Sequence, residues 1–436
     1  MQASQNDEDN EYSLITKLEM LKRFAYSSLL GGSVLFDVLK VREDFPILKK
    51  GVIYLDNAAS SLTPEQVVQK EVEYYHEYRA NVERGVYRMS QRASQEYEQA
   101  HDIVAGFLNA EAGENIAMMK NTTEGINFVA NSLDWRKGDR IVTTVIEHHS
   151  NFIPWLRVGR RHGIEVKVVM SDAEGLFDLA DFERMIDDKT RLVTVTAVSN
   201  VLGCIVPVKA IAEIAHEHDA YVLIDGAQSV PHMKTDIKDM KPDFLAFSGH
   251  KMLGPTGSGG LYIKVDLLYE VEPLCIGGGT IANVTISDYE LARSPMRFEA
   301  GTPPIAQDIG LGEAVKYLQR IGMDKVEQQE RRLTERLVEG LMEMPEVTVY
   351  GPKEPKERLG IVSFNIDGMN PHDVALSLDT MANIAVRSGH HCALPLIEEV
   401  LKLDVGTVRA STYLYNTEEE VERFLGAVEE IIRAVK

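Results

Sequence analysis

Cysteine is scarce in this sequence of 436 residues, with only three thiols, at Cys204, Cys275 and Cys392. They are far apart, and neither a Cys-x-x-Cys pair nor a metal-ligand spacing is present, so no disulfide framework and no metal site is predicted. Such sparse use of cysteine is typical of a reducing compartment. Cys204 and Cys275 lie among apolar neighbours and are interpreted as structural residues, which leaves Cys392 as the thiol with polar surroundings.

Positive charge is also in short supply, because 46 lysines and arginines face 67 aspartates and glutamates, for a formal net charge of -21. No basic patch with interleaved aromatic residues occurs, so the sequence argues against a nucleic-acid partner. An acidic balance of this kind favours solubility rather than a particular ligand.

The N-terminal region lacks the long hydrophobic run of a membrane anchor. Phe24–Phe36 is mildly apolar but too short to span a bilayer. Acidic residues precede it and no small-residue cleavage site follows, so a signal peptide is not predicted. We expect a cytoplasmic protein in which residues 1–40 form an N-terminal extension, poorly ordered before about Glu11 and helical in the rest.

Beyond residue 115, short apolar runs alternate with segments of helical periodicity, which predicts a mostly parallel sheet with helical crossovers in an α/β fold. The expected strands are 116–120, 141–146, 165–170, 191–198, 221–225, 243–247 and 260–264. Polar residues follow the strand ends, namely Thr123, His148, Asn200, Asp225 and Lys251. Since the carboxyl ends of parallel strands share one edge, where α/β sheets bind ligands, we expect these residues to meet there.

The length of the chain is enough for two domains. A long helix is expected to break around Gly322, and the segments beyond it predict a second, smaller α/β unit. We therefore expect a large domain over residues 41–315, of which 41–50 pack on the other domain, and a small C-terminal domain over 316–436. The glycine-rich stretch 272–297 is expected to be irregular.

Lys251 ends the segment SGHK, which closes the apolar run before it. Burial at a strand end would disfavour the ammonium form, and a neutral amine can form a Schiff base with an aldehyde. A lysine in this place is, taken alone, more often a solvated surface residue. The segment 221–228 supports the functional interpretation, because Asp225 can pair with the pyridinium nitrogen of pyridoxal phosphate and Gln228 with its phenolic oxygen. We hypothesise that Lys251 carries pyridoxal phosphate.

The segment NTTEG, residues 121–125, turns from a predicted strand into a helix. Thr122 or Thr123 is expected to cap that helix. The free backbone N–H groups of a helix start can bind an anion such as a phosphate, although a cap without any ligand is the alternative.

Two further stretches can carry chemistry. Cys392 stands beside two imidazoles in RSGHHCALP, and partly charged histidines there would favour the thiolate, yet a lone cysteine is usually a small core residue. Arg409 can bind a substrate carboxylate through two parallel hydrogen bonds, or form a surface salt bridge. The local sequence leaves both pairs of alternatives open.

Together these stretches resemble the class V aminotransferase family of fold-type I pyridoxal-phosphate enzymes, and within it the group II (Suf-type) cysteine desulfurases, close to selenocysteine lyase. The resemblance runs from about Val41 to the end and rests on YLDNAAS, NTTEGINFVANS, EHHSNFIPW, SNVLG, DGAQ, SGHKMLGPTG, RFEAGTP, RSGHHCALP and RASTYLYNT. It implies a seven-stranded sheet, a homodimer and a transferase that converts L-cysteine into L-alanine. It also implies that an acceptor protein or Suf scaffold takes the sulfur for iron–sulfur cluster assembly.

The resemblance also implies residue roles. Lys251 looks like the cofactor-bearing lysine that moves the Cα proton, and Cys392 like the catalytic cysteine that carries the persulfide. The remaining expected cofactor contacts are Asp225 and Gln228 on the ring, His148 stacked on it, Thr123, Ser248 and His250 on the phosphate, and Thr302 on the phosphate of the neighbouring subunit. The expected substrate contacts are Asn200, Arg409 and Arg387.

Two features of the sequence qualify the resemblance. Relatives often have a histidine where this chain has Tyr87, and the short segment 391–395 leaves little room for a long mobile cysteine loop, so an acceptor would have to come to the site. Three alternatives remain: a selenocysteine lyase, a different class V enzyme that needs no thiol, and a scaffold protein without catalysis. The presence of Lys251, Asp225 and Cys392 argues against the scaffold.

Overall fold

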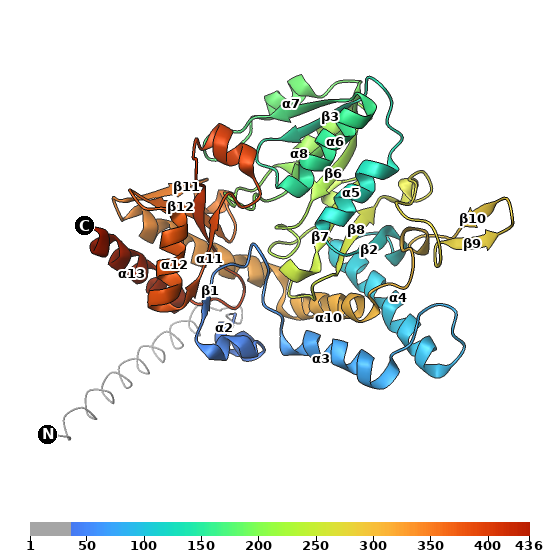
Figure 1. Cartoon of the computed structure of the whole chain (residues 1–436), viewed down its shortest axis with the longest axis horizontal. Helices are drawn as coiled ribbons and strands as arrows, with labels where there is room; N and C mark the ends of the chain where they lie inside the picture. Colours follow the sequence, from blue (N-terminus) through green and yellow to red (C-terminus); the bar gives the residue numbers. More distant parts are fainter. Residues whose placement is uncertain (1–35) are drawn as a thin grey trace, which may run out of the picture. The chain divides into compact units, whose positions relative to one another are not determined.

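The computed structural model describes residues 36–436, and a seven-stranded sheet is the largest in this part of the chain (Figure 1). Its strands lie in the order β2 (Ile116–Met119), β8 (Gly259–Ile263), β7 (Phe244–Ser248), β6 (Tyr221–Asp225), β5 (Thr190–Thr196), β3 (Arg140–Thr144) and β4 (Glu165–Val169). β8 runs antiparallel to both of its neighbours, whereas the other six strands of this sheet all run in one direction. The predicted mostly parallel sheet is therefore confirmed. Residues 1–35 of the predicted N-terminal extension lie outside the described residues.

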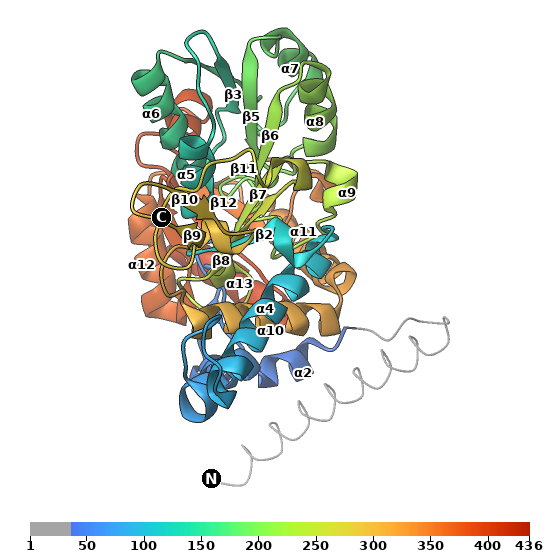
Figure 2. The ribbon, with the colours of Figure 1, turned by 90° about the vertical axis from the view of Figure 1, so that its right-hand side faces the viewer.

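Helices cover both faces of this sheet. The pair α5 (Thr122–Ser132) and α6 (Ile153–His162) lies on one side of the strands, and the pair α7 (Leu179–Met185) and α8 (Val208–Glu217) on the other (Figure 2). The residues of β7 and β8 are accordingly buried throughout. Strands buried on both faces appear in a sequence as continuous apolar runs, which is why these strands could be located without a structure.

The helix after the large sheet breaks where the sequence indicates. α10 (Ile305–Ile321) packs against α4 (Arg88–Leu108) and ends at Gly322, and α11 (Met323–Met342) begins directly after it. Gly322 has φ of 93°, in the region that favours glycine, so the chain can turn there between two helices. The predicted break is therefore confirmed, whereas the domain boundaries around it stay a prediction.

One element differs from the prediction. The stretch 272–297, expected to be irregular, contains an antiparallel hairpin of β9 (Ile281–Val284) and β10 (Tyr289–Leu291), which projects from the rest of the described chain (Figure 1). Nearly all of its residues are exposed. No buried face therefore imposes the alternation of apolar and polar residues by which a strand is recognised, and the prediction was wrong for that reason.

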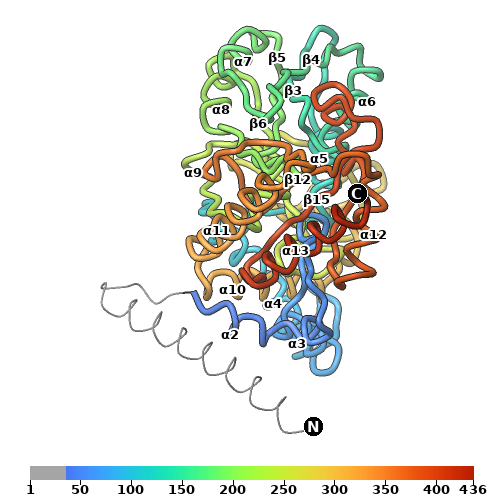
Figure 3. The backbone as a smooth tube through the Cα atoms, turned by 90° about the vertical axis from the view of Figure 1, so that its left-hand side faces the viewer, coloured from blue at the N-terminus to red at the C-terminus, as the bar shows by residue number. Residues whose placement is uncertain are grey.

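A second sheet belongs to the C-terminal part of the chain. Its antiparallel strands lie in the order β11 (Val347–Tyr350), β12 (Ile361–Ile366), β15 (Thr407–Ser411) and β14 (Arg387–Gly389). The helix α13 (Glu418–Val435) packs against both α11 and α12 (Pro371–Ala382) beside these strands (Figure 3). Their facing apolar residues, such as Leu337, Phe364 and Phe424, form one hydrophobic core.

A short N-terminal strand joins this C-terminal core. β1 (Ile53–Tyr54) pairs in parallel with β13 (Ile384–Ala385), and Ile53 and Leu55 are buried in the same core as the C-terminal helices. The backbone of Ser411 donates to the carbonyl of Leu55 at 2.7 Å. Asp56 is thereby delivered to the end of β15, beside residues that are more than three hundred positions away in the sequence.

Two features are absent from the described residues, 36–436. No helix there has both the length and the apolar character needed to cross a membrane. No cluster of three or more histidine, cysteine, aspartate or glutamate side chains there is arranged to hold a metal ion.

Candidate active site

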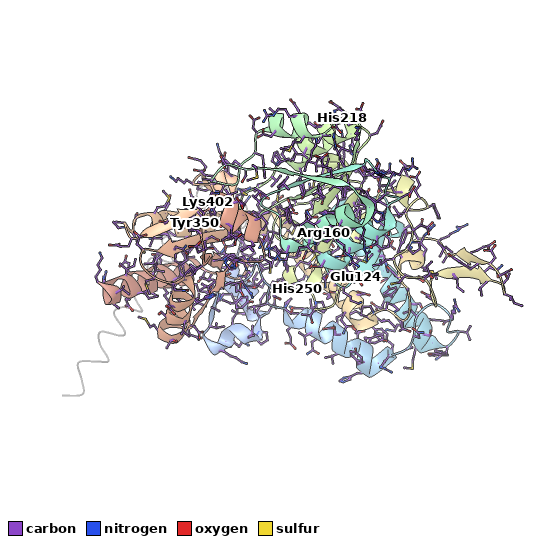
Figure 4. The ribbon with its side chains drawn as sticks, turned by 45° about the horizontal axis from the view of Figure 1, so that its top comes forward. Glu124, Arg160, His218, His250, Tyr350 and Lys402 are labelled. Carbon is purple, nitrogen blue, oxygen red and sulfur yellow. The ribbon has the colours of Figure 1, made fainter. Side chains whose placement is uncertain are left out.

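Polar side chains from the strand ends and from the C-terminal part of the chain line one cavity of about 330 Å³. All the residues predicted for the site, except Thr302, lie on its wall. They are Thr123, His148, Asn200, Asp225, Gln228, Ser248, His250, Lys251, Arg387, Cys392 and Arg409. Several lie within a few residues of the end of a strand of the large sheet, as His250 does two residues after β7 (Figure 4). The expectation that these strand ends share one edge is confirmed.

Thr302, which was predicted for the site, and Tyr87, which was not, both lie away from this cavity. Thr302 lines a different one, together with residues 81–84 and Gly279. Its predicted contact with a phosphate involves a neighbouring subunit and stays a prediction. Tyr87, which stands where relatives often have histidine, is 55% exposed and is absent from the cavity wall, so no acid–base role for it follows from the geometry.

Lys251 ends a short 3-10 turn, Gly249–Lys251, that begins directly after β7. Burial disfavours its ammonium form and lowers the pKa of Lys251 to about 8, with Arg409 and Arg387 acting in the same direction. The carboxylate of Asp225 opposes this shift, but burial outweighs it. A substantial fraction of the amine is therefore neutral near physiological pH and can act as a nucleophile or a base.

Asp225 is the last residue of β6, and Gln228 lies on the turn that follows it. One oxygen of Asp225 accepts from the backbone N–H of Ala227 at 2.9 Å, and burial raises the pKa of this carboxyl although Ala227 and Lys251 oppose the shift. A cation against the other oxygen would favour the charged form. The amide nitrogen of Gln228 donates to the carbonyl of Ala58 at 2.7 Å, while its Oε1 is buried without a protein partner.

The N-terminus of α5 faces the cavity through Asn121, Thr122 and Thr123. The prediction that a threonine caps this helix is wrong, because the side chain of Asn121 accepts from the backbone N–H of Glu124 at 3.0 Å. Thr122 instead bonds to Ser248, with its N–H donating to Ser248 Oγ at 2.9 Å and the two hydroxyl oxygens 2.7 Å apart. The helix start and the Ser248 hydroxyl therefore form one polar wall suited to an anion.

Two histidines on the wall are neutral. Burial lowers the pKa of His148 to about 3 and that of His250 to about 4, and the nearby positive charge of Lys251 acts in the same direction. Nδ1 of His148 accepts from the backbone N–H of Ser150 at 3.0 Å, which places the proton of the ring on Nε2. A neutral ring fixed in this way is suited to stacking on an aromatic group.

Asp56 is a site residue that sequence reasoning missed. Its carboxylate contacts two arginines, with Arg409 Nη2 at 3.2 Å and Arg387 Nη2 at 3.0 Å. Arg409 also donates to the carbonyl of Asn200 at 2.8 Å. Two guanidinium groups against one carboxylate leave one positive charge uncompensated within this group, and that charge is available to a substrate carboxylate. The segment YLDNAAS contains Asp56, but only the pairing of β1 with β13 shows which cations it meets.

The first prediction concerns Asp56→Asn. We expect the free energy of unfolding to fall by about 2–3 kcal/mol, because the buried Arg409 loses its acid partner, and the KM for the substrate to rise, because Arg409 is no longer held in place. Chemical denaturation and steady-state kinetics measure the two effects. Glu422→Gln is the matched control, since it breaks the exposed pair with Arg336 and should change neither quantity. An unchanged stability and KM for Asp56→Asn would contradict the assignment.

Cys392 lies on a short loop between β14 and the turn that starts at Leu396, and its side chain is exposed to the cavity. The carbonyl of His391 accepts from Asn200 Nδ2 at 2.8 Å, and the carbonyl of Cys392 accepts from the backbone N–H of His149 at 2.6 Å. The loop from the C-terminal part is thus attached to the strand-end loops of the large sheet. The thiol and the amine of Lys251 consequently line the same cavity.

One of the two histidines beside this thiol departs from the prediction. Charged histidines were expected to favour the thiolate, but burial and Arg409 lower the pKa of His391 to about 2, so that ring is neutral. The cations that interact electrostatically with Cys392 are instead Lys251, Arg387 and Arg409. Cys204 is buried, which raises its pKa to about 12 and suits its structural interpretation, whereas Cys275 is exposed and departs from it.

This cavity has the groups that pyridoxal phosphate needs. An amine of lowered pKa can take the aldehyde, a buried carboxyl can face the ring nitrogen, and a helix N-terminus can receive the phosphate. The buried Oε1 of Gln228 and Nε of Arg409 have no protein partner, so a bound molecule can satisfy them. The fold and the cavity are accordingly those of a pyridoxal-phosphate-dependent enzyme.

Comparison with known proteins agrees with this class. Residues 53–424 match the aminotransferase class-V family. The chain is 50% identical over 399 residues to a probable cysteine desulfurase of Pyrococcus abyssi, which covers 91% of this chain and 98% of that protein. The apo cysteine desulfurase of Thermococcus onnurineus NA1 superposes with a TM-score of 0.89 at 47% identity, over 92% of this chain and 100% of that one.

A more distant structure contains the cofactor. A mutant of the cystine C–S lyase C-DES, with glycine covalently linked to its pyridoxal phosphate, superposes with a TM-score of 0.77 at 26% identity, over 88% of this chain and 98% of that one. The chain belongs to the class V aminotransferase family and, within it, to the cysteine desulfurases.

Proposed function

We propose that this protein converts L-cysteine into L-alanine and transfers the sulfur to Cys392 as a persulfide. The observation that carries this proposal is the common cavity of Lys251 and Cys392, because a desulfurase needs both a group that handles the Cα proton and a thiol that accepts sulfur. The high identity to cysteine desulfurases over nearly the whole chain supports it.

The residues of the cavity divide the chemistry. Pyridoxal phosphate, when bound, supplies an electron sink for the bonds to Cα. Arg409, oriented by Asp56, binds the substrate carboxylate together with Asn200. The neutral amine of Lys251 takes the proton from Cα and returns one. The neutral rings of His148 and His250 leave the negative charges of the ligand to the cations and N–H groups of the wall.

The thiolate of Cys392 carries out the sulfur transfer. It attacks the sulfur of the substrate, so that an S–S bond forms as the C–S bond breaks. The electron pair of the broken bond goes to the substrate Cβ, which gains one proton to become the methyl group of alanine. Lys251, Arg387 and Arg409 interact electrostatically with Cys392, so the attacking sulfur lies among basic side chains.

The same proposal includes the setting of the reaction. The loop of residues 390–394, which carries Cys392, is short and attached to the loops of the large sheet, so a sulfur acceptor has to come to the cavity, as in the group II (Suf-type) enzymes. We propose that the acceptor is a protein of iron–sulfur cluster assembly in the cytoplasm. We also propose a homodimer in which Thr302 reaches the phosphate held by the neighbouring subunit.

Incubation of the purified holoenzyme with L-cysteine tests the function. With a reducing thiol present, we expect L-alanine and sulfide in equal amounts, and without it a protein whose mass has grown by one sulfur atom at Cys392. Pyruvate and ammonia in place of alanine would overturn the proposal in favour of another lyase reaction. Turnover of L-selenocysteine alone would overturn it in favour of a selenocysteine lyase.

A further inference from the structure

Two neighbouring histidines follow β3, and they have different surroundings. His148 lines the cavity, whereas His149 turns to the loop that carries Cys392. The turn on which both lie is fixed from behind by the buried carboxyl of Glu147. This group accepts from Asn151 Nδ2 at 2.6 Å and from the backbone N–H of Thr196 at 3.0 Å, so the turn is attached both to itself and to β5.

His149 bonds to the chain at the sulfur-bearing residue itself and two residues beyond it. Its backbone N–H donates to the carbonyl of Cys392 at 2.6 Å, and its ring Nε2 accepts from the backbone N–H of Leu394 at 3.0 Å. Asn200 adds a bond to the carbonyl of His391. The ring of His149 is thus a side-chain acceptor for an N–H of this loop.

The backbone of the cysteine loop, defined here as residues 390–394, needs such support. His391 has φ of 53° and Cys392 has φ of 57°, both in the left-handed region that non-glycine residues rarely adopt. Two such residues in sequence persist only where surrounding contacts determine the backbone. The bonds from His149 and Asn200 are contacts of this kind, and they come from loops at the ends of β3 and β5.

We propose that His149 is a positioning residue, whose ring holds the cysteine loop in the conformation that keeps the Cys392 sulfur within reach of the substrate sulfur. This role rests on the proposed desulfurase function. His149 touches neither substrate nor cofactor in it, since its ring is engaged with Leu394. Its loss therefore affects the transfer of sulfur and leaves the carboxylate contacts of Arg409 in place.

Two substitutions of similar size distinguish the effect of the hydrogen bond to Leu394 from the effect of the space that the side chain fills. His149→Gln places an amide oxygen near the position of Nε2, where it can accept from Leu394, and His149→Leu has no acceptor. We expect single-turnover formation of the Cys392 persulfide to fall about 10- to 100-fold in His149→Leu and to be largely restored in His149→Gln. The L-cysteine concentration for half-maximal change of the cofactor spectrum should be the same in all three proteins.

Amide hydrogen exchange gives a readout that does not depend on catalysis. In the cofactor-free protein, residues 390–394 should exchange faster in His149→Leu than in the wild type, and close to the wild-type rate in His149→Gln. Equal behaviour of the two variants, or unchanged exchange in His149→Leu, would overturn the proposal. If the wild type formed no persulfide at all, the proposed function would fail while the exchange experiment still reported on the loop.

Should His149→Leu fail to fold, His149→Asn, whose amide is too short to reach Leu394, takes its place with the same expected losses.

Discussion

Lys251→Ala is expected to lower the kcat for alanine formation from L-cysteine by about four orders of magnitude, the largest loss of any single substitution in this chain. The reason is that one amine both holds the cofactor and moves the Cα proton. Chromatographic measurement of L-alanine checks the result. Lys209→Ala, which removes an exposed lysine paired with Asp239, is the control and should retain full activity. Substantial turnover by Lys251→Ala would contradict the role of this residue.

The same lysine destabilises the fold before the cofactor binds. Its pKa is about 8 in the folded chain and 10.5 when unperturbed, so the unfolded state binds the proton more tightly. The loss of folding stability caused by this ammonium group is fully present below pH 8 and disappears as the pH rises from about 8 to about 10.5. After allowance for partial exposure, we expect Lys251→Met to raise the free energy of unfolding of the cofactor-free protein by about 2 kcal/mol at pH 7, and by less at pH 9.5.

Chemical denaturation at both pH values measures this effect. A gain at pH 7 that shrinks at pH 9.5 is the signature of a buried ammonium group. Equal stability of Lys251→Met and the wild type at pH 7 would show that the amine is well solvated, and the argument for a neutral nucleophile would lose its basis.

Cys392→Ala is expected to lower sulfur release by at least about a thousandfold, because no other thiol lines the cavity within the described residues. Exchange of the Cα hydrogen of L-cysteine in deuterated water should continue in Cys392→Ala, since Lys251 is intact, and should stop in Lys251→Ala. Mass spectrometry of recovered L-cysteine distinguishes the two steps. Cys275→Ser, which removes an exposed thiol outside the cavity, is the matched control. Full sulfur release by Cys392→Ala would show that the desulfurase mechanism is wrong.

The large sheet could be predicted because most of its strands are buried on both faces. β7 and β8 are continuous apolar runs, and the chemistry of Asp225 and Lys251 follows from their places at strand ends. The hairpin of β9 and β10 could not be predicted, since its exposed residues carry no periodic signal. A periodic pattern of apolar residues in a sequence reflects which residues are buried. An element whose residues are mostly exposed therefore shows no such pattern.

The site was predicted less completely where it depends on contacts between distant segments. Asp56 and Arg409 are both visible in the sequence, but their ion pair at 3.2 Å exists only through the pairing of β1 with β13. The error about charged histidines has the same origin. His391 is next to Cys392 in sequence, yet its charge is set by burial and by Arg409, which belong to the folded chain.

The pairing of β1 with β13 has a consequence for the order in which the protein matures. Ile53 has no strand partner until Ile384 has been synthesised, and Asp56 has no cation until Arg387 and Arg409 follow. The N-terminal segment must therefore wait for almost the entire chain to leave the ribosome. The contacts of Asp56 with Arg387 and Arg409, which prepare the binding of the substrate carboxylate, therefore form only near the end of translation. A chain released before that point lacks them and cannot become a partly active enzyme.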